Sequence, residues 1–440
     1  QIFKNRKIEV YEMSESKIKS KVSGDVWILL WVGWLAIALS QILTFGYGMM
    51  VPGIMEDFAM DYDTIGSVGA VASWIAVVAN IPITAMAARS NPKYSLPSIY
   101  LVFAAGCLLF SLANSLPMLY IGRLIAGAGA TGLVSCMVVI KIRRVPADKM
   151  VEINGIENFV QPLGQTCGTL LMAQILALVG GWRTVYQGIC LLMILCAVLW
   201  ILFYSKVNRR DPDIPVQRPD SSNPSREKEK SPLLLALSQK TVILYALAYP
   251  GTIIIWIGFF YYFPSYFMSE RGFTDVQAGL ATGLFPVFSA IASIVSPKLS
   301  KKLDVNKSVL VGSGIALSIL YFIILQISSL PLLCLVSAFT GFVSYLPVPL
   351  YFTNVYKLGL PPKAVQMATS VLLTMVSLGS ALGSSVIGEL ITLYGLYTGL
   401  AVCCATPLWY SLLCLFTPDY SAKAMAKRAA EKAAASSVQS

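Results

Sequence analysis

Long apolar stretches recur along the whole sequence, separated by short polar segments. Each stretch has about 20 residues or more, which is enough for a helix to cross a hydrocarbon core about 30 Å thick. The pattern therefore predicts an all-α polytopic membrane protein. Its twelve predicted transmembrane helices cover residues 26–50, 65–87, 96–114, 118–142, 153–178, 185–205, 241–265, 277–298, 308–327, 331–356, 365–391 and 396–416.

One long polar stretch, rich in charge, proline and serine, divides the predicted helices into two groups of six. Such a composition is typical of a flexible linker. The tail is short and rich in alanine and lysine, so we expect a cytoplasmic helix or a frayed end. The predicted parts are an N-terminal segment (1–25), a six-helix bundle (26–205), the linker (206–240), a second six-helix bundle (241–416) and the tail (417–440).

The two groups of helices carry a sequence repeat. The segment PGIMEDFAMDYDT from residue 52 aligns with PSYFMSERGFTDV from residue 264, an offset of 212 residues that also joins Arg89 to Lys301. The segment PLGQTCG from residue 162 aligns with SLGSALG from residue 377 at an offset of 215. Internal repeats in a membrane protein indicate two bundles of related structure, as in many secondary transporters.

Three motifs support a family resemblance. The loop after the second predicted helix reads TAMAARSNPKYSL, which retains Arg89 and Lys93 of the pattern G-x-L-A-D-R-x-G-R-K-x-x-L. The segment LYIGRLIAGAGATG places Arg123 in the pattern R-x-x-x-G-x-G, and GGWRTVYQG resembles a frequent Gly-Trp-Arg start of a sixth helix. On these motifs the chain resembles the major facilitator superfamily across all twelve predicted helices. The resemblance implies two six-helix bundles related by a pseudo-twofold axis.

The loop departs from the superfamily pattern at two positions. Ala88 replaces the usual aspartate and Asn91 replaces a glycine. The gating ion pair that this aspartate makes in the superfamily is therefore not implied for this chain. The resemblance still makes the loop residues Arg89 and Lys93, and their repeat counterpart Lys301, candidates for gating.

The net charge of +11 is unevenly distributed. With the N-terminus placed inside, every lysine and arginine except Arg123, Arg183 and Arg271 falls in a cytoplasmic segment or at its helix ends. This positive-inside bias orients membrane proteins during insertion. We therefore expect an integral plasma-membrane protein, of a bacterial inner membrane, with both termini cytoplasmic, the lipid bilayer as a partner and no nucleic acid. The first outer loop instead carries Glu56, Asp57, Asp61 and Asp63.

Residue types exclude several kinds of chemistry. The chain has no histidine, and its nine cysteines lie in predicted helices without CxxC spacing, which argues against metal or haem sites and a histidine proton relay. No GxxxxGK[ST] loop is present to indicate ATP drive. GAGATG at 127–132 matches GxGxxG but lies inside an apolar helix, where small residues serve close helix packing. We expect no cofactor, no metal and no enzymatic activity.

Arg123 lies about five residues, or roughly 8 Å, inside the outer end of its predicted helix. An intramembrane arginine is costly and usually faces a wet cavity or a partner. One interpretation is an anchor for an anionic substrate, because guanidinium binds carboxylate bidentately. The other is a conformational latch, as the resemblance implies for many superfamily members.

The polar segment EINGIENFVQPLGQ at 152–165 is predicted to be helical. At about 100° per residue, Asn154, Glu157, Asn158, Gln161 and Gln165 fall within an arc of roughly 120°, and the apolar side chains fall opposite. This sorting has no cause in a loop. The segment therefore forms one face for lipid and one for protein or water.

The partner of Glu157 follows from the hairpin of the fourth and fifth helices. Folding the chain about Asp148 places Glu157 level with Lys141, whereas Arg123 lies some 20 Å away, near the opposite membrane face. We therefore predict an ion pair between Glu157 and Lys141. Glu157 is then a structural or gating carboxylate, a protonatable group of a coupled carrier, or a side chain exposed at the inner mouth. Gln161 and Gln165 are further gating or coupling candidates.

Polar and aromatic residues on the first, seventh and tenth helices are substrate-cavity candidates, because the resemblance implies that helices 1, 4, 7 and 10 line the cavity. A break is expected at Pro250–Gly251 of the seventh helix. Ordinary helix packing is the alternative for each residue. The candidates besides Arg123 are Gln41, Thr44, Tyr47, Tyr249, Trp256, Thr340, Tyr345, Tyr351 and Asn354.

Three functions remain open. The first is a secondary active or exchange transporter, expected to be monomeric, that moves a small-molecule solute by alternating access, with a proton or counter-ion as coupled partner. Arg123, Lys141 and the shortage of central acids favour an organic anion such as a carboxylate. The second is efflux of amphipathic drugs by proton antiport, although the Gly-Pro-x-x-Gly-Gly element of such antiporters is missing from GQTCGTLL at 164–171. The third is a non-transporting receptor on the same scaffold.

Overall fold

The computed structural model describes residues 22–145, 149–210 and 232–437, which form helices joined by turns, without strands. The helices α2 to α9 form the first bundle, called the N-half. They are α2 (Gly24–Phe45), α3 (Tyr47–Phe58), α4 (Tyr62–Arg89), α5 (Pro92–Ser111), α6 (Leu116–Arg144), α7 (Met150–Leu170), α8 (Met172–Val179) and α9 (Trp182–Arg210).

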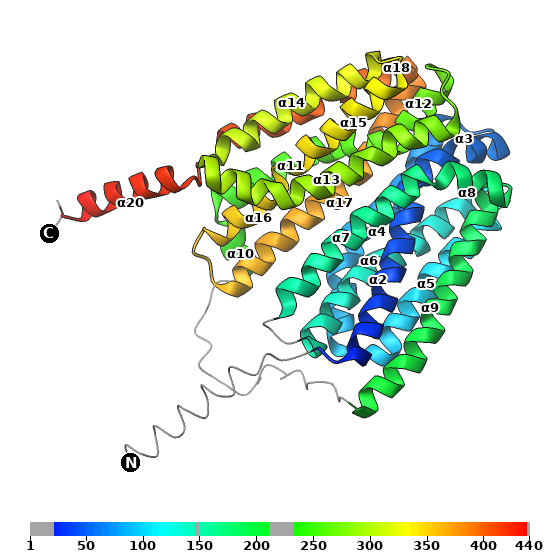
Figure 1. Cartoon of the computed structure of the whole chain (residues 1–440), viewed down its shortest axis with the longest axis horizontal. Coiled ribbons are helices and arrows are strands. Elements are labelled where there is room, and N and C mark those ends of the chain that lie inside the picture. The colour runs from blue at the N-terminus through cyan, green and yellow to red at the C-terminus, as the bar shows by residue number, and fades with distance from the viewer. Residues whose placement is uncertain (1–21, 146–148, 211–231, 438–440) are drawn as a thin grey trace.

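The helices α10 to α19 form the second bundle, called the C-half, and α20 extends away from both bundles (Figure 1). They are α10 (Pro232–Leu237), α11 (Lys240–Tyr261), α12 (Phe263–Ser269), α13 (Asp275–Leu303), α14 (Lys307–Gln326), α15 (Leu330–Tyr345), α16 (Val348–Tyr356), α17 (Pro362–Tyr394), α18 (Leu396–Cys403), α19 (Thr406–Leu415) and α20 (Ala422–Ser437).

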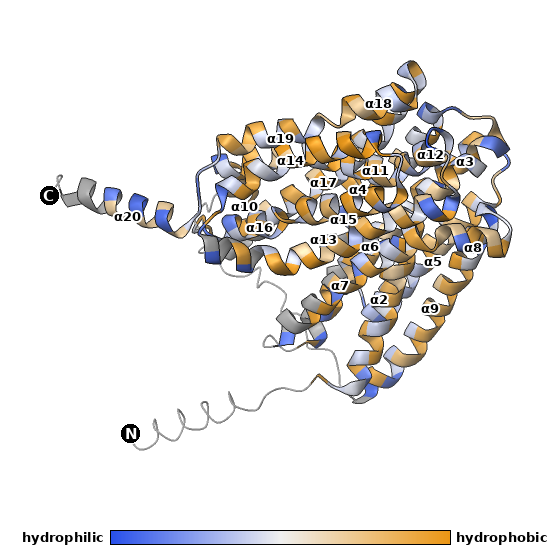
Figure 2. Ribbon diagram, turned by 45° about the horizontal axis from the view of Figure 1, so that its top comes forward, coloured by the Kyte–Doolittle hydropathy of each residue, from blue (hydrophilic) through white to orange (hydrophobic). Residues whose placement is uncertain are grey.

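The fold is that of a polytopic membrane protein. In the described residues, eleven helices or helix pairs are long and apolar enough to cross a membrane, and the number is twelve when the bent pair α7 and α8 is counted as one span. Figure 2 shows apolar residues along the outer faces of both bundles, and leucines such as Leu191 and Leu202 of α9 are exposed there. An apolar surface of this extent is stable only against lipid. The predicted twelve-helix fold class is confirmed.

Side-chain caps fix the start of two helices. Asp61 accepts a hydrogen bond from the backbone N–H of Thr64 (2.8 Å) at the start of α4, and these bonds from Thr64 lower the pKa of the Asp61 carboxyl. Asn91 accepts one from the backbone N–H of Lys93 (3.0 Å) at the start of α5. Such caps satisfy N–H groups that have no partner within the helix. Asn91, a departure from the superfamily loop pattern, therefore has a local structural role.

Several expected helices differ from those observed. The first, tenth and twelfth predicted helices are each divided into two, as α2 and α3, α15 and α16, and α18 and α19. The fifth span, predicted as one helix over 153–178, bends by 56° at Leu171. Thr166 and Thr169 donate to backbone carbonyls four residues earlier, a contact that bends helices. In the seventh span, α11 continues through Pro250 to Tyr261, so the predicted break is wrong. Neighbouring helices support membrane helices that contain proline, and α19 packs directly against the following glycine.

The polar segments around the bundles contain two described helices. α10 lies within the predicted linker, and its Ala236 is completely buried. The tail forms α20, whose first backbone N–H groups, of Ala422 and Lys423, donate to the carboxylate of Asp304 (2.5 and 3.1 Å). The C-terminal tail is thus tied to the residue that follows α13.

The sequence repeat corresponds to a repeat of contacts. Gly164 packs against Ala38 and Gln41 of α2, and Gly379 packs against Pro250 and Ile253 of α11. The glycines are 215 residues apart and their α2 and α11 contacts 212 apart, the two offsets found in the sequence. One turn further along, Gly168 meets Ile42 and Gly383 meets Ile254 at the same offsets. The same helix-packing contact therefore occurs in both halves.

The halves contact each other at one end and diverge toward the other (Figure 1). The end where α9 ends at Arg210 and α11 begins at Lys240 is called the linker end, and the opposite end, which carries α3, α8, α12 and α18, the distal end. Near the distal end the rings of Tyr47 and Tyr261 lie 4.9 Å apart, and the N–H of Asp63 donates to Thr392 (2.9 Å). The hydrogen bonds from Asp63 to Thr392 and from Arg123 to Tyr261 join the two halves, the first in this distal region and the second at the central cavity.

The close helix packing predicts large effects of side chains at the repeated glycines. A Cβ atom at Gly168 would lie 2.5 Å from the carbonyl oxygen of Ile42, and one at Gly383 would lie 2.7 Å from that of Ile254. Gly168→Leu and Gly383→Leu should each reduce stability by about 1–3 kcal/mol through overpacking. Thermal unfolding in detergent measures the effect. Gly188→Leu is the control, since nothing lies within 4 Å of a Cβ there; equal losses in all three variants would contradict the repeated contact.

Candidate functional site: a central cavity at the boundary of the halves

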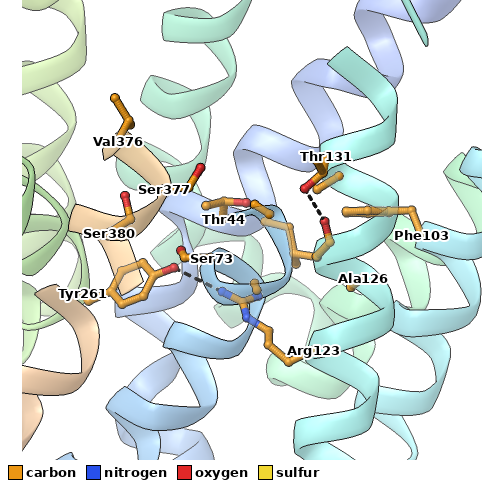
Figure 3. Close-up of a pocket in the computed structure, with 15 residues that line it drawn as sticks. Thr44, Ser73, Phe103, Arg123, Ala126, Thr131, Tyr261, Val376, Ser377 and Ser380 are labelled. Atoms are coloured by element: carbon orange, nitrogen blue, oxygen red, sulfur yellow. Dashed lines mark hydrogen bonds between the residues drawn. The ribbon is translucent and has the colours of Figure 1, made fainter. Parts of the chain in front are cut away.

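A cavity of about 180 Å³ lies between the two halves (Figure 3). Its walls come from α2, α4, α5 and α6 of the N-half and from α11 and α17 of the C-half. Hydroxyl groups and one arginine supply its polar surface, and no aspartate or glutamate occurs among its lining residues. The polar residues that line it are Thr44, Ser73, Arg123, Thr131, Tyr261, Ser377 and Ser380.

Arg123 is the charged group of this cavity and is only 4% exposed. Its guanidinium donates to the hydroxyl of Tyr186 in the N-half and to that of Tyr261 in the C-half, each over 3.2 Å. The guanidinium also lies over the ring of Tyr47, 4.4 Å from its centroid. Figure 3 shows the bond to Tyr261 across the boundary. Arg123 therefore connects the two halves.

The positive charge of Arg123 lacks an anionic partner. Within the part of the chain that the structure describes, no carboxylate forms an ion pair with it, and its Nε has no hydrogen-bond partner. Neutral hydroxyls and an aromatic face compensate a buried cation only in part. An unsatisfied buried donor costs about 1–3 kcal/mol. The cavity is therefore electrostatically complementary to an anion.

The candidates on the first helix, and Trp256, lie near this cavity. Thr44 lines it, and Tyr47 packs beside Arg123 while its hydroxyl donates to the carbonyl of Ile65 (3.2 Å). Gln41 packs against Gly164 of α7, and Trp256 packs against the ring of Phe45 across the boundary of the halves. The structure thus brings Thr44, Tyr47 and Arg123 together.

Tyr249 of the seventh predicted helix and three candidates of the tenth lie elsewhere. Tyr249 and Tyr351 pack edge to face within the C-half, with ring centroids 4.9 Å apart. Asn354 is fully buried and exchanges two hydrogen bonds with Asn306 (2.8 and 2.9 Å). The hydroxyl of Thr340 donates to the backbone of its own helix. These four residues do not line the central cavity, because in this half their side chains fill contacts between helices.

A second space between the halves, of about 460 Å³, lies closer to the linker end. Gln161 and Gln165 of α7 line it together with Tyr345 of α15 and Phe352 of α16. The three polar residues were predicted as candidates, and the structure brings them to one surface. This surface differs from the one that carries Arg123.

The predicted ion pair between Glu157 and Lys141 is confirmed. Lys141 Nζ lies 2.9 Å from Glu157 Oε2, and both side chains are buried. The indole N–H of Trp34 also donates to this carboxylate (3.2 Å). Three helices of the N-half, α2, α6 and α7, therefore meet at one carboxylate.

Lys141, Glu157 and Trp34 all belong to the N-half. The repeat offsets place Leu372 and Tyr356 where Glu157 and Lys141 stand in the first half, so the fold itself needs no ion pair there. An inner gate between the halves needs partners from both halves. The pair alone therefore does not close such a gate in this structure.

The loop candidates lie at the linker end. The ammonium of Lys93 lies over the ring of Tyr94, 5.3 Å from its centroid. The backbones of Arg89 and Lys301 lie at the linker ends of α4 and α13. The placement of these two side chains is outside the described part of the chain, so their gating role stays a prediction.

Several cavity residues were missed by the sequence interpretation. Tyr261 and Ser73 lie on α11 and α4, and Ser380 follows Ser377 by one turn of α17. The sequence predicts no cavity candidate on the eleventh helix, which carries both serines. A helical wheel of the eleventh helix would have grouped Ser377 with Ser380. Nothing local distinguishes Tyr261 from its neighbour Tyr262.

The sequence family that matches this chain is described as the Major Facilitator Superfamily, and the matches cover residues 33–384 and 272–439. The chain belongs to the Major Facilitator Superfamily. It is a transporter of this superfamily, consistent with movement of a small solute across a membrane.

Relatives with curated descriptions are distant but nearly full-length. A probable sugar efflux transporter from Mannheimia succiniciproducens is 23% identical over 375 residues, which are 83% of this chain and 88% of the relative. The purine ribonucleoside efflux pump NepI from Salmonella paratyphi B is 22% identical over 357 residues, 79% of this chain and 83% of the relative. These superfamily relatives differ in substrate.

Solved structures share the fold. A bacterial homologue of the human lysosomal transporter Spinster, in an inward-facing and unoccupied conformation, has a TM-score of 0.74 and 16% identity over 90% of this chain and 96% of that chain. Its inward-facing and occupied conformation gives a TM-score of 0.69, with 89% and 95% covered. At this identity the likeness shows the superfamily fold alone.

The buried cluster predicts a charge-swap result. Lys141→Glu or Glu157→Lys alone should destabilise the protein by about 3–5 kcal/mol, because each leaves like charges buried together. The double variant, with both charges exchanged, should recover most of this loss in detergent unfolding measurements. The control is the exposed pair Lys427–Glu431, 3.9 Å apart, whose exchange should cost less than about 1 kcal/mol. Additive losses in the buried double variant would contradict a direct pair.

Proposed function

We propose that this superfamily member moves a small polar solute with an anionic group, such as an organic carboxylate, by alternating access between its halves. The observation that carries the proposal is the buried charge of Arg123, which has no carboxylate partner in the described residues and faces a hydroxyl-lined cavity. Guanidinium binds a carboxylate through two parallel hydrogen bonds. The hydroxyls of Thr44, Ser73 and Ser377 would bind other polar groups of the solute.

The bond between Arg123 and Tyr261 gives this solute a way to affect the conformation. The two groups belong to different halves, so the bond favours the state in which the distal ends contact each other. A solute carboxylate would compete with the tyrosine hydroxyls for the guanidinium N–H groups. Binding would then weaken one contact between the halves, which unites the anchor and latch interpretations of Arg123.

The proposed orientation of the protein in the membrane, with the linker end in the cytoplasm, is the one expected from its charge distribution. Basic residues, among them Lys149, Arg209 and Lys298, lie at the linker end, and acidic residues such as Asp61 and Asp63 lie at the distal end. The positive-inside bias favours a cytoplasmic linker end. The distal contacts together with the divergence at the linker end then support an inward-facing state of a monomeric carrier.

For Glu157 we propose a positioning role. Its carboxylate holds Lys141 and Trp34 and thereby fixes α7, the helix that also presents Gln161 and Gln165 to the second space between the halves. Proton coupling through Glu157 stays the alternative. Glu157→Gln, which cannot take up a proton, separates the positioning role from proton coupling. If Glu157 couples transport to protons, the variant should change the pH dependence of the transport rate. If Glu157 only positions α7, the variant should change the transport rate equally at every pH.

Efflux of a neutral, hydroxylated solute is the second candidate function. It is favoured by the hydroxyl groups of the cavity and by the relatives described as sugar and purine ribonucleoside efflux proteins. Such a solute would use the cavity hydroxyls without an ion pair to Arg123. The charge of the transported solute therefore separates the two candidates.

Exchange in proteoliposomes, with a panel of carboxylates, sugars and nucleosides, tests the proposal. Arg123→Lys should lower the affinity for an anionic solute about 10- to 100-fold, because it removes charge-assisted bidentate bonding. Tyr261→Phe is the matched variant: it removes the hydroxyl acceptor but keeps the charge, so the anion affinity should be retained or rise.

The other outcomes are distinct. Flux of sugars or nucleosides with unchanged affinity in Arg123→Lys would contradict the anionic solute and support the neutral one. If both variants slow the transport of all solutes equally and leave their affinities unchanged, Arg123 acts only as a conformational latch and does not bind the solute. No flux across the panel, with the protein folded, would support a non-transporting receptor.

A further inference from the structure

A third cavity, of about 540 Å³, lies at the distal end and shares no lining residue with the central cavity. Between the two cavities lie the contacts of Tyr47 with Tyr261 and of Gly48 with the backbone of Phe260. We propose that this distal cavity is a binding site for an amphipathic cation, separate from the solute site. Such a ligand would stabilise the state in which the distal ends are in contact.

The residues that line the distal cavity suit a ligand with a large, polarisable apolar part. Met49 and Met50 contribute from the end of the first span, and Met268 contributes from α12. Methionine thioethers are polarisable and adapt to irregular ligands. Tyr62 and Trp182 add aromatic surface, which attracts cations as well as apolar groups. The volume is within the usual range for a drug-sized ligand.

The charge of the distal end selects for a cation. Asp275, at the start of α13, lines the cavity. Of the nearby bases, Arg183 pairs with Asp57 (3.3 Å), and the guanidinium of Arg271 donates to Ser328 and to the carbonyl of Leu325. Acids outnumber bases among the described residues around this end, which favours accumulation of cations. They are Glu56, Asp57, Asp61, Asp63, Glu270 and Asp275.

Both halves build this cavity. Met50 and Trp182 belong to the N-half, whereas Met268 and Asp275 belong to the C-half. The cavity therefore requires the distal ends to be together, and a ligand that binds it shifts the population toward that state. A carrier that moves its solute by alternating access, as proposed above, must leave this state once per cycle. Occupation of the distal cavity would thus inhibit transport without competing for the central cavity.

Tetraphenylphosphonium, a large apolar cation, is a suitable probe. Equilibrium binding of the radiolabelled probe to the purified, detergent-solubilised protein should be saturable and should raise the unfolding temperature. Asp275→Asn should weaken binding by at least about fivefold, while asparagine still suits the start of a helix. The matched control is Glu270→Gln, which removes an exposed acid of the same end that does not line the cavity, and it should change binding less than about twofold.

Competition defines the location of the probe. We expect Arg123→Lys to leave binding of tetraphenylphosphonium unchanged. We also expect the probe to inhibit solute exchange, and excess solute not to relieve this inhibition. Equal weakening by Asp275→Asn and Glu270→Gln would overturn the proposal in favour of general surface charge. Relief by excess solute would place the probe in the central cavity, and lack of saturable binding would also overturn it. Because binding is measured without transport, absence of flux would contradict the proposed function but not the distal site.

Discussion

A buried cation at the boundary of two helical bundles is the constraint on which the site depends. Arg123 is held by the hydroxyls of Tyr186 and Tyr261 and by the face of Tyr47, and no carboxylate of the described residues pairs with it. An ion in a medium of low dielectric constant stays costly until a counter-charge arrives. The same side chain therefore favours an anionic ligand and connects the halves through Tyr261. In the proposed function, solute binding and conformational change therefore both depend on the guanidinium of Arg123.

The helix packing around Arg123 is repeated in the two halves, whereas the charged groups are not. Gly168 on Ile42 and Gly383 on Ile254 repeat one packing contact in both halves. The ion pair of Glu157 and the charge of Arg123 occur in the first half alone, where the repeat offsets give Leu372 and Ala338 in the second. Helix packing accounts for the repeated positions.

Features that depend on residues close together in the sequence were predicted correctly, whereas features that depend on contacts between distant helices were not. The all-helical membrane fold, the repeat and the pairing of Glu157 with Lys141 depend on local periodicity and on one tight hairpin, and the structure confirms them. The bend at Leu171 and the continuity of α11 through Pro250 depend on neighbouring helices. Tyr261 reaches Arg123 across the two halves, a contact that no local pattern encodes. Asn354 has the polar character of a cavity residue, but its fixed partner Asn306 lies on another helix.

The central claim is that an anionic solute releases Arg123 from Tyr261 and so allows the distal ends to separate. Distances between spin labels at Ala59→Cys and Thr274→Cys, two exposed distal positions in different halves, test it in a background without native cysteines. The transported anion should add a population with a longer distance, and Arg123→Lys should abolish this change on addition of the anion. If the anion lengthens the distance between the labels equally in the parent protein and in Arg123→Lys, the claim is contradicted.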